Sequence, residues 1–266
     1  MGKTLAERIL SQKSGSDARA GDIVIAQVDL VFAQDTTGPL TIRQFQAGNL
    51  KRLADPKKTV LFLDHAAPSP NQEIANDHRL LRQFAQEMGC LIYDVGGGVC
   101  HQIVVESLAK PGDVIVGADS HTVTAGGLGA FATGMGSSDV AVVFGLGKTW
   151  FRVPESVKIV LSGKLLQGVG AKDLVLHLIG TIGADGATYK ALEFGGERLA
   201  KMSMSDRFTI ANMAVEAGAK VGLFPADNTT RDYLKSQGRG DHYQPLSADD
   251  DASYEKTINI DLASLE

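Results

Sequence analysis

The chain has 266 residues, of which 44% are hydrophobic and 21% are charged, and its formal net charge is −5. This length allows two domains of ordinary size and a sizeable core. The acidic balance, without a basic patch, argues against nucleic-acid binding. The sequence has no apolar run near the ~20 residues that cross a bilayer, and its first residues lack the apolar core of a signal peptide. We therefore expect a cytoplasmic protein that binds neither nucleic acid nor membranes.

The first part of the chain alternates helices and apolar strands. In chain order, the pattern predicts a helix at 3–13, a strand at 22–31, a helix at 40–53, a strand at 59–63, a helix at 76–88, a strand at 90–95, a helix at 99–108, a strand at 114–116 and an apolar segment at 139–146. Strands that alternate with helices predict a largely parallel sheet covered on both faces. The fold class is therefore α/β.

A domain boundary is expected near Val153–Glu155, which divides the chain into residues 1–155 and 156–266. Beyond it, the pattern predicts a strand at 157–162, a helix at 171–182, a strand at 191–194, a helix at 205–217, a strand at 221–224, a helix at 228–237 and a strand at 257–262. The helix at 205–217 is expected to be capped by Ser205 or Asp206.

Asp119, Ser120 and His121 stand where the strand at 114–116 ends, before a glycine-dense stretch expected to form a loop. Ligands collect at the carboxyl ends of parallel strands, which favours a functional site here. The alternative is a capped turn, in which Asp119 and Ser120 bind local backbone amides.

Two more polar groups follow strands: Asp64 and His65 after the strand at 59–63, and His101 after the strand at 90–95. A carboxylate beside an imidazole fixes its tautomer and raises its basicity, which suits proton transfer near neutral pH. We expect one cleft to collect all of these residues: Asp64, His65, His101, Asp119, Ser120 and His121.

Other interpretations stay open at this point. Three histidines and two aspartates could bind a divalent metal, as in a metal-dependent hydrolase, although no His pair has the helical i, i+4 spacing. Gly127–Ala132 matches a dinucleotide pattern, but the acidic residue that should follow is missing. His78 is expected on a helix surface and His177 in the core, whereas His242 could be either. Asn212 and Glu216 share one helix face, either as site residues or as an exposed polar stripe.

Three motifs carry a family resemblance: GGGVCHQIVVE, GADSHTVTAGGLGAFATGMGSSD and FTIANMAVEAGAKVGLFPAD. The chain resembles the aconitase superfamily over essentially its whole length, and within it the large subunits of two-subunit dehydratases. This resemblance implies three-layer α/β/α domains that form a cleft with a swivelling domain, which two-subunit members carry on a separate small subunit.

The resemblance implies a hydro-lyase that dehydrates and rehydrates a 2-hydroxy di- or tricarboxylic acid. A four-iron four-sulfur (4Fe-4S) cluster would bind the substrate as a Lewis acid. The first expected substrate is 3-isopropylmalate, in leucine biosynthesis, and the alternatives are homologated or methyl-substituted malates. A non-catalytic assembly module that keeps the fold is a further alternative.

Site roles follow from the motif match. Paired acids that protonate the departing hydroxyl would be Asp64, His65, His101 and Asp119. Ser120 and His121 would orient the substrate and the cluster, and Gln34 would bind a substrate carboxylate. Asn212 and Glu216 would hold the cluster and its bound water.

The three cluster cysteines of the family do not match Cys90 or Cys100 and are expected beyond Glu266, together with substrate-binding arginines. We therefore expect these 266 residues to be the first two domains of a large subunit. Alone, they are expected to bind no cluster and to have little activity, because two cysteines cannot supply three thiolates. An apolar surface left by the missing third domain would favour self-association.

Overall fold

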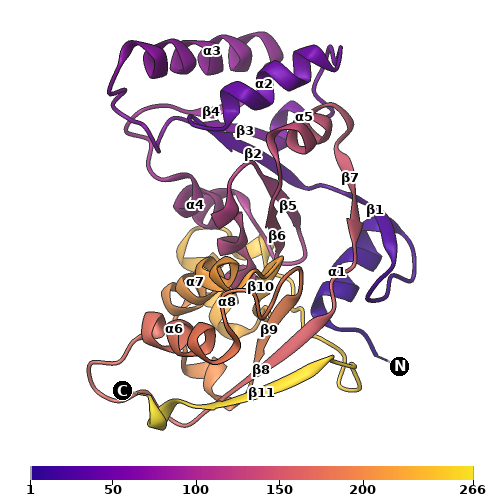
Figure 1. Ribbon diagram of the computed structural model, residues 1–266, viewed down its shortest axis with the longest axis vertical. Coiled ribbons are helices and arrows are strands. Elements are labelled where there is room, and N and C mark those ends of the chain that lie inside the picture. Colours follow the sequence, from indigo (N-terminus) through magenta and orange to yellow (C-terminus); the bar gives the residue numbers. More distant parts are fainter. Residues whose placement is uncertain (1, 266) are drawn as a thin grey trace.

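The computed structural model describes residues 2–265, which form two parallel sheets and an antiparallel ribbon (Figure 1). The elements of the first half are α1 (Leu5–Ser14), β1 (Ile23–Gln27), β2 (Leu30–Gln34), α2 (Gly38–Ala47), β3 (Thr59–Phe62), α3 (Gln72–Met88), β4 (Leu91–Tyr93), α4 (Cys100–Ile103), β5 (Val114–Gly117), η3 (Ser120–Leu128), β6 (Phe131–Gly134), α5 (Ser137–Leu146) and β7 (Lys148–Arg152). Those of the second half are β8 (Ser156–Ser162), α6 (Ala171–Ile182), β9 (Ala191–Gly195), α7 (Met204–Met213), η5 (Ala214–Ala217), β10 (Val221–Leu223), α8 (Asn228–Ser236) and β11 (Lys256–Asp261).

The first sheet has the order β4-β3-β2-β5-β6, and all its neighbouring strands are parallel. The chain builds outward from β2 through β3 to β4, and then returns to the other side of β2 with β5. The strand order therefore reverses between β2 and β5. In open α/β sheets, the carboxyl ends of the strands at such a reversal form a crevice for ligands.

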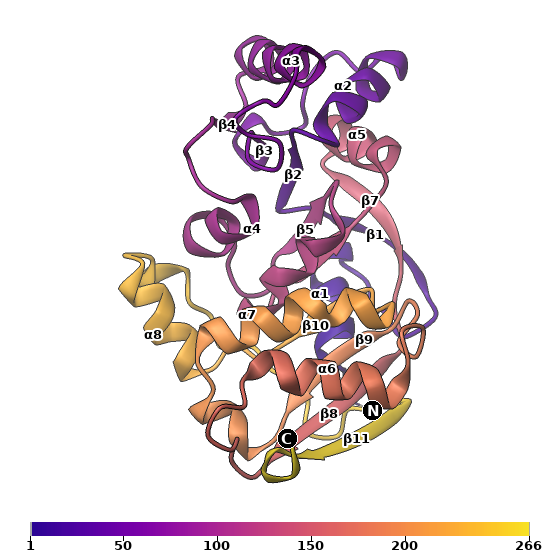
Figure 2. The same ribbon diagram turned by 60° about the vertical axis from the view of Figure 1, so that its left-hand side comes forward.

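Side chains along β2 point alternately to the two faces of this sheet, and each face is covered by helices. Val31 and Ala33 point toward the core shared with α1, α2, α3 and α5, whereas Leu30 and Phe32 point toward a second core shared with α4. Figure 2 shows α4 on the opposite side of the strands from α2 and α5. This arrangement confirms the predicted α/β class and, for the first sheet, the three layers implied by the resemblance.

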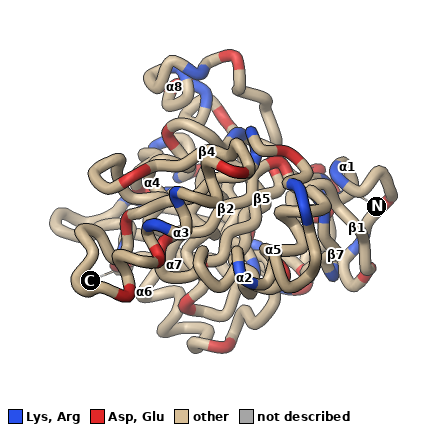
Figure 3. The backbone as a smooth tube through the Cα atoms, turned by 90° about the horizontal axis from the view of Figure 1, so that it is seen from above, with Lys and Arg blue, Asp and Glu red and all other residues tan. Residues whose placement is uncertain are grey.

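Charged residues of both signs are interspersed along the backbone in the view of Figure 3. Arg207 of α7 is a buried exception: it is 0% exposed and its guanidinium forms two hydrogen bonds with the Asp227 carboxylate, at 2.9 and 2.6 Å. A bidentate pair with a buried guanidinium fixes geometry more than it adds stability. Within residues 2–265, we find no helix with the length and apolar character needed to cross a membrane.

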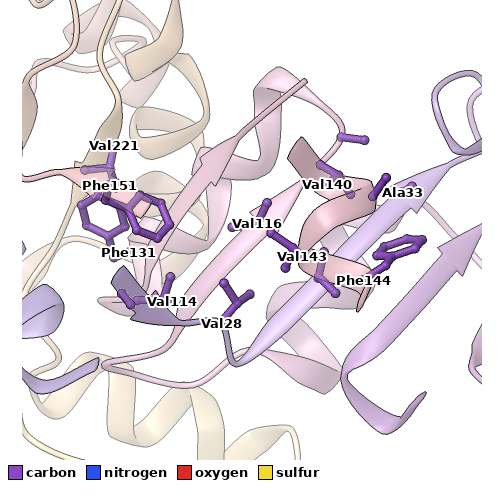
Figure 4. Close-up of a cluster of buried hydrophobic side chains, with 14 of the residues drawn as sticks. Val28, Ala33, Val114, Val116, Phe131, Val140, Val143, Phe144, Phe151 and Val221 are labelled. Atoms are coloured by element: carbon purple, nitrogen blue, oxygen red, sulfur yellow. The ribbon is translucent and has the colours of Figure 1, made fainter. Parts of the chain in front are cut away.

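The second sheet has the order β10-β9-β8-β11 and is also parallel. Helices α6 and α7 cover one face with an apolar core of their own. The two sheets are not separated by solvent, because Val221 of β10 packs with Phe131 and Phe151 of the first half (Figure 4). The Phe131 and Phe151 rings meet edge to face, with centroids 5.7 Å apart.

The single strand predicted at 22–31 is wrong, because this segment forms two strands in two sheets. β1 pairs with β7 in the antiparallel ribbon, and β2 enters the first sheet. The change occurs at Val28 and Asp29: the Val28 amide donates to Gly147 O at 2.9 Å, and the Asp29 amide donates to Val114 O at 2.8 Å. Lys13 also forms an ion pair with Asp29 at 2.7 Å. Long-range partners, rather than local propensity, break the strand.

The glycine-dense stretch is also more regular than predicted, because it forms η3 and then β6. Gly126 and Gly127 are buried, and a Cβ atom on them would lie 1.9 Å from Gly222 O and 2.6 Å from the Phe208 ring. These two glycines therefore allow η3 to approach β10 and α7. Their close packing against protein does not support the dinucleotide-loop interpretation.

Helix α7 begins earlier than the sequence predicted. Its N-cap is Ser203, whose Oγ accepts from the Asp206 amide at 3.2 Å while the Asp206 carboxylate accepts from the Ser203 amide at 3.1 Å. This reciprocal pair is a capping box, so the assignment of the cap to Ser205 or Asp206 is wrong. The helix then tightens into η5, which ends at Gly218 in the left-handed conformation.

Candidate active site

The polar groups predicted from strand ends lie at the carboxyl edge of the first sheet. Asp64 and His65 follow β3, Asp119 follows β5, and His101 lies in α4, which follows β4. Because β3 and β5 flank β2, these side chains surround the point where the strand order reverses.

Asp119 is at the centre of this arrangement. Its Oδ1 lies 3.1 Å from His101 Nε2, and its Oδ2 lies 3.6 Å from His65 Nε2. Oδ1 also accepts a 2.7 Å hydrogen bond from the His121 amide, so Asp119 caps η3 as well. The turn-capping and site interpretations of this residue therefore both describe real contacts. Partial burial raises the pKa of Asp119, but the His101 hydrogen bond and the neighbouring imidazoles outweigh it and lower the pKa to about 2.

A second carboxylate orients His65 from the other side. Asp64 Oδ1 lies 2.9 Å from His65 Nδ1, and its Oδ2 accepts a 2.6 Å hydrogen bond from the Cys100 amide. His65 thus has a carboxylate near each ring nitrogen. Its ring lies 6.0 Å from that of His101, which in turn lies 6.2 Å from that of His121. Three imidazoles that share two carboxylates can hold and pass protons.

Asp35, which was not predicted as a site residue, binds the backbone of the segment that carries His65. It is fully buried, and its carboxylate accepts 3.0 Å hydrogen bonds from the amides of His65 and Ala66. His78 Nε2 lies 3.0 Å from the same carboxylate. His78 is only 3% exposed, so its predicted surface position is wrong. The position of Asp35 directly after β2 was the signal that could have found it.

The residues from the second half face His121. Glu216 Oε1 lies 3.5 Å from His121 Nε2, and Ser120 Oγ lies 3.3 Å from His121 Nδ1. Asn212 of α7 donates to Thr124 Oγ1 at 2.8 Å. Asn212 and Glu216 therefore contact η3 and its first residues, rather than forming an isolated exposed stripe.

Gln34, the last residue of β2, is 2% exposed. Its Oε1 accepts hydrogen bonds from Thr36 N at 2.5 Å and from Thr36 Oγ1 at 2.7 Å. The side chain is thus held within the loop that follows β2, next to Asp35.

The two remaining histidines lie elsewhere. His177 is exposed on α6, which contradicts its predicted core position, since the buried face of that helix is formed by Leu174, Val175 and Leu178. His242 is exposed, with Nδ1 3.2 Å from Arg239 Nη2.

A cavity of about 330 Å³ opens beside the Asp119–Ser120 segment. Its walls come from η3, from the β6–α5 connection, and from the segment that links η5 to β10. The apolar part of its wall includes Val123, Met135 and Val215. This volume can admit a small molecule of a few carbon atoms.

Two sets of three side chains could each offer ligand atoms to a metal ion, because within each set these atoms lie within 4.8 Å of one another. The first set is His65, Cys100 and His101, and the second is Asp35, Asp64 and His65. The carboxylates of the second set already accept hydrogen bonds from backbone amides. Burial, and then the nearby Asp64, raise the pKa of the Cys100 thiol. Burial also raises the pKa of Cys90 to about 11. Neither thiol is disposed to become a thiolate, so the cysteines of residues 2–265 do not fit an iron–sulfur cluster.

Comparison with known proteins shows which family this chain belongs to. Residues 7–266 match the model of the aconitase family (aconitate hydratase). The chain belongs to the aconitase family. It is 57% identical over its whole length to a 3-isopropylmalate dehydratase large subunit of Elusimicrobium minutum, 54% to large subunit 1 of Thermotoga maritima, and 56% to large subunit 2 of Archaeoglobus fulgidus.

The family resemblance and the α/β fold expected from the sequence are thus confirmed. The chain covers 64%, 63% and 64% of the lengths of these three relatives, in the same order. In each of the three comparisons the aligned stretch spans all 266 residues of this chain.

Proposed function

We propose that this chain is part of the large subunit of a hydro-lyase that dehydrates and rehydrates a 2-hydroxy acid with two or more carboxylates, with 3-isopropylmalate as the substrate. The observation that carries this proposal is the Asp119 carboxylate, which is shared by His65 and His101 at the carboxyl edge of the sheet. The 54–57% identity to relatives named 3-isopropylmalate dehydratase large subunits supports the substrate.

Dehydration breaks a C–O bond and a C–H bond on the neighbouring carbon: a base takes the proton from carbon, and a positioned acid protonates the hydroxyl, which leaves as water. Asp119 is not that acid, because its pKa of about 2 keeps it ionised at neutral pH. Its Oδ1 instead lies 3.1 Å from His101 Nε2 and so orients that imidazole. His101, fixed by Asp119, and His65, fixed by Asp64, are therefore the two proposed proton donors.

The remaining site residues position the substrate. Ser120 and His121 would hold the substrate oxygen that faces η3, and Gln34 would bind a carboxylate at the end of β2. The Glu216 carboxylate, 3.5 Å from His121 Nε2, would set the tautomer of that imidazole. Asn212 and Glu216 would together hold the bound water.

In the family, a 4Fe-4S cluster acts as the Lewis acid for the substrate hydroxyl. The cysteines within residues 2–265 do not fit as its ligands, so we assign none of them to it and derive no step through it. The cluster would belong to the full-length protein. Its partner would be a small subunit, as the relatives' designation "large subunit" implies.

We also propose that residues 1–155 and 156–266 are two domains. Each half contributes one parallel sheet, which supports this division. Contacts between the halves, such as those of Val221 with the first core, make them one packed body.

The test is steady-state kinetics of the full-length protein, expressed with its small subunit and assayed without oxygen. We expect kcat/KM to be highest for 3-isopropylmalate among four acids, the others being citramalate, dimethylmalate and homocitrate. A higher value for one of the others would change the substrate and leave the reaction type intact. Absence of hydration and dehydration with all four would overturn the proposed function.

A further inference from the structure

The cavity beside Asp119 is lined by a cation that the proposed mechanism does not use. Lys220 lies between η5 and β10, and it lines the same cavity as Asp119 and Ser120. It therefore reaches this cavity from the second half of the chain.

The Lys220 ammonium group is only partly satisfied. Its Nζ donates to the carbonyl oxygen of Gly134 at 3.3 Å and lies 5.6 Å from the centroid of the Tyr189 ring. An ammonium group has three donors, and in residues 2–265 Lys220 Nζ has no carboxylate oxygen within 4.0 Å.

Burial lowers the pKa of Lys220, and the charge of Asp139 opposes this change only in part. A half-buried cation that lacks a close anion gains from one that enters the cavity. The proposed substrate carries at least two carboxylates, so it would bring such an anion with it.

The position of the cation suits one end of this substrate. Asp119 lines the same cavity, and its carboxylate is ionised and already contacted by His101 and His65. A carboxylate of the substrate would therefore bind at Lys220 rather than beside the anionic Asp119. Val123, Met135 and Val215 also line this cavity and offer an apolar wall to the carbon chain of the substrate.

We propose that Lys220 is a positioning residue that binds one carboxylate of the substrate, and so orients its carbon chain in the cavity toward Asp119 and Ser120. This inference rests on the proposed function and adds the location of one substrate carboxylate. Lys220 Nζ would exchange or share its bond to Gly134 O with the incoming carboxylate, which forms a charge-assisted hydrogen bond.

A purely structural role is the competing explanation, since Lys220 joins the two halves of the chain through Gly134 and Tyr189. Lys158 provides a matched control. Its Nζ lies 5.1 Å from the centroid of the Tyr254 ring, but it does not line this cavity. A lysine with only a structural role should behave like Lys158 in every measurement.

The experiment uses the full-length protein with its small subunit and compares Lys220→Met, Lys220→Arg and Lys158→Met. We expect Lys220→Met to raise KM for the substrate about 10- to 100-fold while kcat changes less than about 3-fold. Lys220→Arg should recover most of this loss, and Lys158→Met should leave KM unchanged. An unchanged KM in Lys220→Met, with wild-type turnover intact, would overturn the inference and leave the proposed function standing.

A second readout does not need turnover. Reductive methylation of lysines, mapped by mass spectrometry, reports whether Lys220 is shielded by malonate or 3-isopropylmalate. We expect protection of Lys220 by either dicarboxylate, but not by glycerol or by chloride at equal ionic strength, and no protection of Lys158. Labelling of Lys220 that is equal with and without the dicarboxylates would overturn the inference. Protection without turnover of any acid would support the carboxylate site while the proposed function fails.

Discussion

Two carboxylates, the half-buried Asp119 and the buried Glu193, lie in different halves of the molecule and have different roles. Asp119 of the first half is surrounded by imidazoles, whereas Glu193 of β9 accepts 2.9 Å hydrogen bonds from the amides of Leu5 and Ala6 at the start of α1. Ser156 Oγ and the Tyr254 hydroxyl also donate to Glu193, at 2.9 and 3.2 Å.

The pKa values of the two groups move in opposite directions. Imidazoles lower the pKa of Asp119 to about 2, whereas complete burial raises the pKa of Glu193 despite its donors. The partners explain the difference, because an imidazole can carry a positive charge and an amide or hydroxyl cannot. We therefore expect a catalytic role for a carboxylate whose partners can carry a positive charge, and a structural role for one whose partners cannot.

Replacement of Asp119 should have the largest effect. In the full-length protein, Asp119→Asn keeps the shape and an acceptor for the His121 amide, but it removes the carboxylate that orients His101 and His65. We expect kcat/KM to fall about 1,000-fold, with an unchanged circular dichroism spectrum. A loss below about 10-fold would show that Asp119 is a capping residue only.

Replacement of Glu193 should instead affect stability. Glu193→Ala leaves two amides at the start of α1 and two hydroxyls without their acceptor. We expect the free energy of unfolding to fall by about 3 kcal/mol, measured by urea denaturation, while kcat/KM of the folded protein is retained. The exposed Glu155 is a matched control, and Glu155→Ala should change stability by less than about 0.5 kcal/mol. Lost activity in folded Glu193→Ala would contradict the division between the two groups.

Asp113 is a third carboxylate, whose burial should make the stability of the protein depend on pH. Its carboxylate is 3% exposed, and within residues 2–265 its Oδ1 has no hydrogen-bond partner. Burial, with the nearby charge of Asp29, raises its pKa to about 7 from the ordinary value of 3.8.

Because the folded state holds this proton between about pH 4 and pH 7 and the unfolded state does not, the contribution of Asp113 to stability falls as the pH rises through this window. Asp113→Asn mimics the neutral acid. We expect it to match the wild type at pH 4 and to exceed it by about 2 kcal/mol at pH 8, as measured by urea denaturation. Equal stability at both pH values would show that the group is not neutral in the folded state.

Asp35 shares features with both Asp119 and Glu193. Like Glu193 it binds backbone amides, but the amides belong to the segment that carries the site residue His65. Asp35→Asn places an amide donor against one of two backbone donors. We expect the free energy of unfolding to fall by about 1–2 kcal/mol, because a backbone donor loses its acceptor. We expect kcat to fall about 10-fold, because the His65 ring moves away from the Asp119 carboxylate. A loss of stability with unchanged kcat would place Asp35 with Glu193.

Much of the fold could be predicted where apolar runs are dense. The strand at 59–63 and the helix at 171–182 lie within a residue of β3 and α6. β6 was missed because its four residues, Phe131–Gly134, lie in a glycine-dense stretch, and its pairing with β5 decides its conformation. Likewise, the division of 22–31 depends on partners more than 80 residues away.

The strand-end rule, applied to the residues themselves, found the group that the structure brings together around Asp119. It missed Asp35, which directly follows β2, because the strand was predicted to end at residue 31, four positions earlier. His78 had a readable signal: it lies three residues before Leu81 and seven before Ala85, on the buried face of α3. Lys220 had none, because its cavity forms only when the two halves pack together.

The contact between α1 and Glu193 also constrains the order in which the chain can fold. The first helix caps its amides with a residue 188 positions further along, and the Lys3 amide reaches Asp249 at 2.8 Å. During synthesis, at roughly 5–20 residues per second, the start of the chain must wait about ten seconds or more for these partners. Helix α1 therefore docks late in folding, although it leaves the ribosome before the residues that hold it.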